Sequence, residues 1–489
     1  MVMPRNSVPR DARIGTDPCR PLHAGPPLSS SESDLVGFAS PEGFDPVLRA
    51  FLHQAADLLC DWIGHASERM PLPPVRRQPD IAPSLHGAGM QGLLSDLQLV
   101  MEGAYQPSHP GALAHLDPPP LTASIAAELV CAGLNNNLLA EELSPGLTQL
   151  EQQLCRWFAA RLGLPATAGG VLASGGTLSN LMALVVGREQ IDPSSRQQGV
   201  VVCSRDAHVS LLKSVRILGL GDQALLQLPV DVDGCLCVEA LEAALRRLED
   251  EGRPCLAVVA TAGTTVRGAI DPLKAVASLC RRYGVWMHVD AAIGGVFALV
   301  PSLAGPLEGI AAADSLTLNP QKLLGITKAS SLLLLRHGSL LKQAFSTGLP
   351  YMDQPSGDHH GGEVGLQGTR PAEVLKLWLG LRQLGERGIE SILRNALDRC
   401  DRLCRNLDDE RLRLYRGSLH LVAFRPLALS GEARTQWSID TRQRLFEHHF
   451  MLSRPLYDRG PCLKAVLGNP HTTVAHLDHL ADLINASVI

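Results

Sequence analysis

The fold is decided by residues 255–292, which read CLAVVATAGTTVRGAIDPLKAVASLCRRYGVWMHVDAA. Two apolar runs, Cys255–Ala260 and Val285–Val289, have the length and the β-branched content of buried strands. Between them, Pro272–Tyr283 has apolar residues at helical spacing. A strand, a helix and a second strand in this order predict a βαβ crossover with a parallel strand pair.

The same alternation extends over residues 168–340 and predicts a mostly parallel sheet covered by helices on both faces. Further strands are expected at Gly170–Ala173, Val200–Cys203, Leu225–Pro229, Ser315–Leu318 and Ser330–Leu335. Further helices are expected at Leu178–Arg188, His208–Leu218 and Val238–Leu248. The fold class is therefore α/β. Such sheets bind ligands beyond the carboxyl ends of their strands, so the residues at those ends are the candidates for function.

Composition excludes several classes of protein. The 489 residues carry 44 Lys and Arg against 49 Asp and Glu, and a net charge of −5 gives no basic surface for nucleic acid. No apolar run is long enough to cross a bilayer, so no membrane partner is expected. The 12 cysteines are scattered and form no CxxC pair, which favours a reducing, cytoplasmic location.

Three strand ends carry unusual chemistry. Ser174-Gly-Gly-Thr177-Leu-Ser-Asn180 joins a strand to a helix without the lysine of a nucleotide loop, which suits a small monophosphate. Asp290 leaves an apolar strand and needs a cationic partner; an ordinary ion pair, or a metal held with His288, is the alternative. Lys322 follows another strand beside apolar residues, so it is expected to be either a desolvated, nucleophilic amine or a surface lysine.

A phosphate cradle, a carboxylate and a nucleophilic lysine together suit pyridoxal 5′-phosphate (PLP). The motifs that carry these groups, with His109-Pro110 and Thr261-Ala-Gly-Thr-Thr265, resemble those of the group II PLP-dependent amino-acid decarboxylases over residues 105–480. This family includes the glutamate, aromatic-L-amino-acid and L-2,4-diaminobutyrate decarboxylases. The resemblance implies the fold type I architecture of PLP enzymes and a homodimer with active sites at the subunit interface.

The resemblance also implies a domain plan. The prolines and the Ser-Ser-Ser run of residues 1–40 indicate a disordered leader. After it we expect an N-terminal helical arm and dimer-packing segment at 41–120, a large PLP-binding α/β domain at 121–375 and a small C-terminal α+β domain at 376–489. The helical periodicity that begins at Phe44 and ends near the prolines after Met70 agrees with the arm.

The family's catalytic roles can be carried onto matching positions. Lys322 matches the Schiff-base lysine, Asp290 the partner of the pyridinium nitrogen, and His208 the imidazole that stacks on the ring. Tyr351, in a Gly-rich segment expected to form a lid, matches the tyrosine that reprotonates Cα. Its presence favours plain decarboxylation over the aldehyde-forming branch.

Roles in binding follow in the same way. Arg370 matches the arginine that receives the α-carboxylate of the substrate. The residues that match cofactor-binding positions, beside Lys322, are Gly176, Thr177, Asn180, Thr265, Asp271, Ala292 and Gln321. Many relatives have histidine where this chain has Gln321, which donates a hydrogen bond but carries no charge.

The substrate is expected to be a small polar amino acid. His115 and Asp117 occupy the family's substrate side; Asp117 would pair with a distal amine, whereas His115 would favour an acidic side chain. We expect 2,4-diaminobutyrate as the preferred substrate, with aspartate, glutamate or cysteine sulfinate as the next candidates. An aldehyde synthase, an aminotransferase and a non-catalytic paralogue are the alternatives, and no resident metal is expected.

Overall fold

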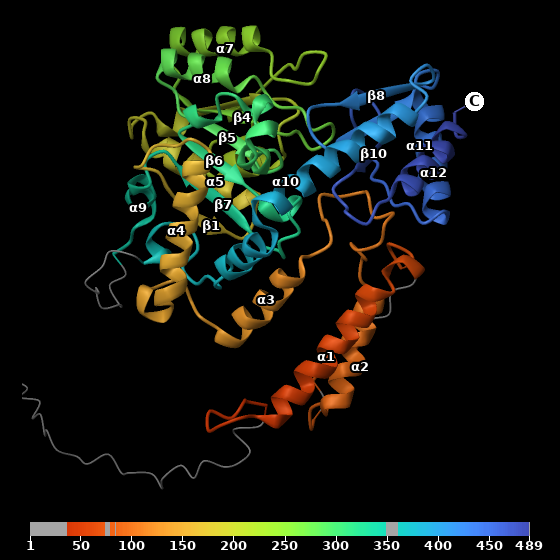
Figure 1. Ribbon diagram of the computed structural model, residues 1–489. Helices are drawn as coiled ribbons and strands as arrows, with labels where there is room; N and C mark the ends of the chain where they lie inside the picture. The colour runs from red at the N-terminus through yellow and green to blue at the C-terminus, as the bar shows by residue number, and fades with distance from the viewer. Residues whose placement is uncertain (1–36, 74–78, 84, 349–359, 489) are drawn as a thin grey trace, which may run out of the picture.

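The computed structural model describes residues 37–73, 79–83, 85–348 and 360–488, and its centre is a seven-stranded sheet (Figure 1). The strand order is β1-β7-β6-β5-β4-β2-β3. The five strands from β6 to β3 run parallel to one another, whereas β7 is antiparallel to both β6 and β1. The strands are β1 Gly169–Ala173, β2 Val200–Ser204, β3 Leu225–Leu228, β4 Cys255–Thr261, β5 Met287–Ala291, β6 Ser315–Leu318 and β7 Ser331–Leu335. The predicted α/β class with a mostly parallel sheet is confirmed.

Helices cover both faces of this sheet because its strands are apolar on both sides. Val201 and Val259 pack with one group of helices, whereas their neighbours Val202 and Val258 pack with another. This alternation follows from the two-residue period of a strand. The first group is α5 Gly176–Glu189 and α6 Ser210–Ile217, and the second is α4 Pro145–Arg161, α7 Val238–Asp250 and α8 Leu273–Tyr283.

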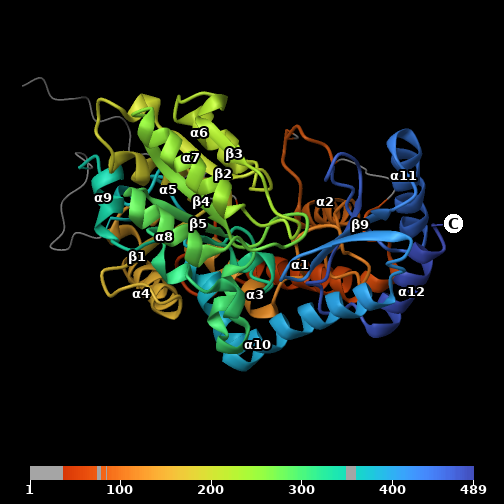
Figure 2. The ribbon, with the colours of Figure 1, turned by 90° about the horizontal axis from the view of Figure 1, so that it is seen from above.

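A smaller unit follows along the chain. It contains an antiparallel sheet of order β10-β9-β8, with β8 Leu412–Arg416, β9 Leu421–Pro426 and β10 Leu463–Val466. Helices α11 Gly431–Glu447 and α12 Val474–Asn485 pack beside this sheet (Figure 2). The long helix α10, Val374–Asn406, runs from the large unit into the small one and kinks at Gly385, whose φ is +59°. Helix α9, Ser339–Phe345, closes the large unit beyond β7.

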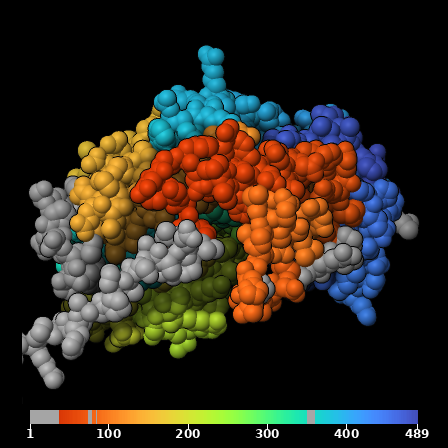
Figure 3. Space-filling model, turned by 90° about the horizontal axis from the view of Figure 1, so that it is seen from below, coloured from red at the N-terminus to blue at the C-terminus, as the bar shows by residue number. Residues whose placement is uncertain are grey.

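The N-terminal part forms an arm. Helices α1 Pro46–Gly64 and α2 Met90–Glu102 lie side by side, and α3 Thr122–Leu134 packs on α10 (Figure 1). Asp45 caps α1 by accepting the amides of Val47 and Leu48, both at 2.9 Å. Figure 3 shows the arm lying across one face of the molecule, over both units. Since α1 itself contains no buried residue, the arm has little core of its own.

Candidate active site

A cavity of about 200 Å³ lies beyond the carboxyl ends of the central strands, where the sheet topology predicts a ligand site. Of the eleven cofactor-binding or catalytic residues expected from the sequence, nine line it. These nine are Gly176, Thr177, Asn180, His208, Thr265, Asp290, Ala292, Gln321 and Lys322. Thr261, Gly263, Ile293 and Asn319 complete the lining.

The loop from β1 to α5 forms an anion cradle at one end of the cavity. Gly175 has a φ of +154°, and a Cβ on Gly176 would lie 2.9 Å from Asn319 Nδ2, so side chains are disfavoured at both positions. The first amides of α5 have no acceptor within the helix, and its dipole favours an anion there. The cradle therefore fits a phosphate group.

Asp290 ends β5 as a buried carboxylate held by neutral donors. Its Oδ2 accepts Asn180 Nδ2 at 2.8 Å and its Oδ1 accepts the amide of Ala292 at 3.2 Å. Asn180 Oδ1 in turn lies 3.1 Å from His288 Nε2, and His288 Nδ1 lies 2.8 Å from Ser315 Oγ. Each Asp290 oxygen has a lone pair left to accept a further donor from the cavity.

The hydrogen bonds of this network assign the tautomer of His288. Burial lowers the pKa of His288, so its imidazole is neutral at pH 7. Because Asn180 turns its amide nitrogen to Asp290, its oxygen must accept, and Nε2 of His288 must carry the proton. The role of His288 is to orient Asn180, and the alternative of a metal ligand has no support from this geometry.

Lys322 follows β6 and has no hydrogen-bond or ion-pair partner among the residues that the structure describes. Burial lowers its pKa, while the charges of Asp290 and Asp117 oppose that shift. The pKa of the neighbouring His208 is also lowered, chiefly by burial and further by Lys322. The cavity therefore holds an amine and an imidazole that both lose protons more readily than usual.

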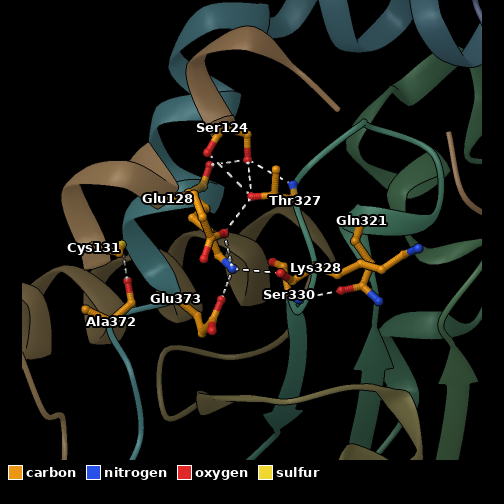
Figure 4. A network of polar contacts seen from close by, with 10 residues as sticks. Ser124, Glu128, Cys131, Gln321, Thr327, Lys328, Ser330, Ala372 and Glu373 are labelled. Atoms are coloured by element: carbon orange, nitrogen blue, oxygen red, sulfur yellow. Dashed lines mark hydrogen bonds and ion pairs between the residues drawn. The ribbon is translucent and has the colours of Figure 1, made fainter. Parts of the chain in front are cut away.

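A buried lysine secures the turn that follows Lys322 (Figure 4). Lys376 of α10 is 1% exposed; its Nζ donates to the carbonyl of Lys328 at 2.9 Å and pairs with Glu128 at 2.7 Å and with Glu373. Thr327 donates its amide to Ser124 Oγ at 2.9 Å.

Gln321 takes part in fixing the same turn. Its Oε1 accepts the amide of Ser330 (Figure 4). Gln321 thus ties the two ends of this turn together.

Asp271 lies outside the cavity, although the resemblance placed it near the cofactor. It is 1% exposed, and its two oxygens accept the amides of Leu236 and Thr261, each at 2.7 Å. Burial raises its pKa to about 6. Asp271 fixes the end of β4 rather than lining the site.

The structure does not bring Arg370 into the cavity. Its guanidinium is 5% exposed and pairs with both oxygens of Glu151, at 3.0 and 3.1 Å. A further bond joins it to the carbonyl of Leu172. Both terminal nitrogens are therefore occupied in this structure, and the expected role of Arg370 in receiving the carboxylate of the substrate stays a prediction. Sequence could not reveal Glu151 as its partner, because the two residues are far apart in the chain.

The substrate side contains two cations that sequence reasoning missed. Lys328 Nζ lies 2.6 Å from Asp117 Oδ1. Lys464 of β10 is 6% exposed and donates to the carbonyl of Thr265 at 3.3 Å. Burial, together with the charge of Lys322, lowers the pKa of Lys464 to about 8. His115 is exposed, and desolvation lowers its pKa.

Tyr351 lies outside the described residues, as do most of the residues of the expected lid. In the part of the chain that is described, no helix is both long and apolar enough to span a membrane. Among the same residues, no group of three or more His, Cys, Asp or Glu side chains is arranged to hold a metal ion.

Comparison with known proteins decides the family. The model of the pyridoxal-dependent decarboxylase conserved domain matches residues 75–425. The chain belongs to this family. It is 33% identical to an L-2,4-diaminobutyrate decarboxylase of Rhizobium meliloti, over 81% of this chain and 82% of that protein. It is 30% identical to human cysteine sulfinic acid decarboxylase, over 81% and 85% of the two chains.

Solved structures agree on the fold. A crystal structure of mouse CSAD superposes with a TM-score of 0.84 and 26% identity, covering 91% of this chain and 99% of that one. A decarboxylase domain from Vibrio parahaemolyticus superposes with a TM-score of 0.79 at 23% identity, over 92% and 96%. The protein is a PLP-dependent amino-acid decarboxylase of fold type I.

The residues of the cavity fit PLP. The cradle at α5 suits its phosphate, Asp290 has accepting capacity left for the pyridinium nitrogen, and Lys322 offers an amine without a partner. These three groups come from β1, β5 and β6 of one sheet or from the loops that follow them; β5 and β6 are neighbours, and β7 separates β6 from β1.

Proposed function

We propose that this decarboxylase converts L-2,4-diaminobutyrate into 1,3-diaminopropane and CO₂. The observation that carries the proposal is the carboxylate of Asp117, which holds an ammonium group, that of Lys328, at 2.6 Å. A carboxylate there suits the distal ammonium of this substrate. The 33% identity to a diaminobutyrate decarboxylase supports the choice.

The chemistry needs few groups from the chain. When bound, PLP supplies an electron sink for the electron pair that CO₂ leaves behind. We propose that Asp290 holds the pyridinium, that the cradle holds the phosphate and that Lys322 holds the aldehyde. His208 covers the ring, and Ala292 leaves space beside it. Asn180 keeps the carboxylate of Asp290 oriented.

We propose that Lys464, rather than Arg370, meets the α-carboxylate of the substrate. Lys464 is a buried cation near Lys322, whereas Arg370 is already neutralised by Glu151. Burial strengthens the attraction between an ammonium group and a carboxylate. Tyr351 remains our candidate for returning a proton to Cα.

A panel of amino acids tests the substrate. The purified enzyme is incubated with diaminobutyrate, ornithine, aspartate, glutamate and cysteine sulfinate, and the amines are identified by mass spectrometry. Diaminobutyrate should give the highest kcat/KM, and Asp117→Asn should lower that value about tenfold or more, as expected for one lost charge-assisted bond. Asp409→Asn, an exposed aspartate elsewhere, is the matched control. A D117N enzyme with unchanged kcat/KM for diaminobutyrate would refute the role of Asp117.

An acidic amino acid is the second candidate, and one observation favours it. Lys328 already pairs with Asp117 at 2.6 Å, so the substrate side contains two lysines, Lys328 and Lys464, against one carboxylate. Two cations suit a substrate with two acidic groups, such as aspartate or cysteine sulfinate. If Lys328→Met abolishes turnover of cysteine sulfinate and D117N does not impair it, this second function replaces the first.

We also propose that the enzyme is a homodimer. On α1, Val47 is 70% exposed, and on α2 the side chains of Leu93, Leu97 and Val100 are 43%, 42% and 52% exposed. An exposed apolar face of this kind indicates a protein contact, and a second copy of the chain would cover it.

Light scattering after gel filtration tests the dimer. Val47→Glu with Leu97→Glu should shift the mass from about two chains to one, because charges would be buried at the contact. His53→Glu with Ser95→Glu, on other faces of the same helices, is the control. A wild-type enzyme that elutes as a monomer at micromolar concentration excludes the proposal.

We propose a cytoplasmic location because the described cysteines form no disulfide bonds. All eleven cysteines that the structure describes have free thiols, and several, such as Cys155 and Cys203, are buried in the core. Reduced thiols of this kind are typical of proteins in reducing compartments.

A further inference from the structure

A second and larger cavity, of about 900 Å³, lies between the loops of the large sheet and the sheet of the small unit. Figure 2 shows these loops reaching from the large sheet toward β9. The cavity contains none of the residues that line the candidate active site. Its walls include six arginines: Arg205, Arg267, Arg413, Arg425, Arg434 and Arg459.

The positive charge of this cavity is only partly compensated. Three aspartates, Asp206, Asp231 and Asp458, face the six arginines. Arg425 pairs with Asp458 at 3.0 Å, and Arg205 lies 3.9 Å from Asp206. Within the described part of the chain, no carboxylate lies within ion-pair distance of the other four arginines.

Two tyrosines further occupy the carboxylates. Tyr415 donates its hydroxyl to Asp458 Oδ2 and Tyr457 donates to Asp206 Oδ2, both at 2.6 Å. Burial raises the pKa of Tyr457 to about 12, and it raises the pKa of Tyr415 as well, so both stay protonated donors. Asp206 and Asp458 are thus held by hydroxyl groups, and Asp231 accepts the amides of Asp233 and Cys235, which leaves guanidinium donors available to a ligand.

Arg267 provides a buried donor without an acceptor. It is 7% exposed, and its terminal nitrogens donate to the carbonyls of Val232 and Arg416 at 3.2–3.3 Å. Its Nε is buried and has no hydrogen-bond partner, and neither has the buried Nε of Arg434. Buried donors are normally satisfied, so two such groups at one cavity indicate a missing acceptor.

We propose that this cavity binds a small polyanion that carries two or more negative charges on phosphate or carboxylate groups. Guanidinium groups bind both kinds of oxyanion through paired N–H donors. A volume of about 900 Å³ accommodates a metabolite of ordinary size. The site is separate from catalysis but shares two loops with it, because Asp206 lies two residues before His208 and Arg267 two residues after Thr265.

Isothermal titration of the PLP-loaded enzyme tests the site, with inorganic pyrophosphate and citrate as separate probes at 0.15 M NaCl. We expect saturable binding of at least one probe, with one molecule per chain and with the visible absorbance of the bound cofactor unchanged. Arg413→Gln with Arg434→Gln should weaken that binding tenfold or more, since each substitution removes a charged donor. Arg387→Gln with Arg405→Gln, two exposed arginines of α10, is the matched control and should change the affinity less than twofold.

The two probes also separate the sources of the ligand. Binding of pyrophosphate alone assigns a phosphorylated ligand, and binding of citrate alone assigns a polycarboxylate. Arg459→Gln, a single change on an exposed loop, should reproduce part of the loss if the double variant folds poorly. Absence of saturable binding by either probe, equal weakening in the control, or displacement of the cofactor by the probe would each overturn the proposal.

Discussion

At the scale of single residues, Asp290 has the most demanding task in the site. A carboxylate on a strand between two parallel neighbours is costly to bury, and among the described residues only Asn180 and one backbone amide donate hydrogen bonds to it. This cost is reasonable if a cationic group completes the site. The neutral network of Asn180, His288 and Ser315 then holds the carboxylate in place without competing for its charge.

Asp290→Asn should retain the cofactor and lose turnover. The amide keeps the shape of the side chain but has no charge to hold a pyridinium, so kcat should fall on the order of 100-fold or more. The visible spectrum would report the bound PLP, and a steady-state assay of CO₂ release would report kcat. A D290N enzyme with kcat within threefold of the wild type would contradict the role of Asp290.

The sequence predicted the residues of the site that lie at strand ends, because their position follows from the strand pattern itself. Lys322, Asp290 and Gly176 each stand directly beside a buried apolar run and so had to meet at one edge of the sheet. The partner of Arg370 and the approach of Lys464 depend on how α4 and the small unit pack. That packing leaves no local signal in the chain, so the sequence revealed neither Glu151 as the partner of Arg370 nor the position of Lys464.

At the scale of elements, the predicted and observed bounds of a strand agree closely wherever the strand is buried on both faces. The predicted Ser315–Leu318 is the observed β6, and the predicted Cys255–Ala260 is one residue shorter than β4. The strand expected at Val285–Val289 is shifted by two residues, because Val285 and Trp286 precede the parallel ladder that begins at Met287. The arm was predicted as a single helix, whereas α1 is joined by α2, which lies beyond the prolines that follow Met70.

Helix α10 should act on the active site through the turn after Lys322. Lys376→Met removes the buried ammonium that holds the carbonyl of Lys328, and leaves Glu373 without its cation. We expect a loss of stability of about 3 kcal/mol, the size found when one partner of a buried ion pair is removed. Urea unfolding would measure it.

If Lys376 positions Lys322, its removal should also change the pH dependence of the bound cofactor. The pH at which the absorbance of the bound cofactor changes should shift in K376M, because Lys322 would no longer be held in place. In Lys376→Arg, this pH should return part of the way to the wild-type value. If K376M is less stable but its absorbance titration is unchanged, Lys376 is only a structural residue.

At the scale of the whole molecule, two buried histidines lie where different parts of the molecule pack together. His420 of the small unit is fully buried, stacks on Phe297 of the large unit at 6.1 Å, and neither of its ring nitrogens has a hydrogen-bond partner. Burial, with Arg399, lowers its pKa to about 3. His109, at the junction of the arm, lies beside His449, and burial lowers its pKa to about 4.

These shifts predict how stability depends on pH. In the unfolded chain both histidines take up a proton below about pH 6.5, whereas in the folded chain they stay neutral until about pH 4 for His109 and pH 3 for His420. The unfolded state therefore binds more protons in this window, and stability should fall as the pH drops from 6.5, by up to ~1.4 kcal/mol per pH unit for each histidine.

His420→Leu should reduce the fall of stability with decreasing pH, because leucine cannot be protonated. Leucine also fits an apolar site without an unsatisfied ring nitrogen. The midpoint of thermal unfolding, measured from pH 7.5 to 4.5, should fall less steeply in H420L than in the wild type, and the two curves should converge toward neutral pH. His471→Gln, which removes an exposed histidine, should leave the slope unchanged. Parallel curves for H420L and the wild type would mean that His420 takes up its proton over the same pH range in the folded and the unfolded chain, and that acid lability arises elsewhere.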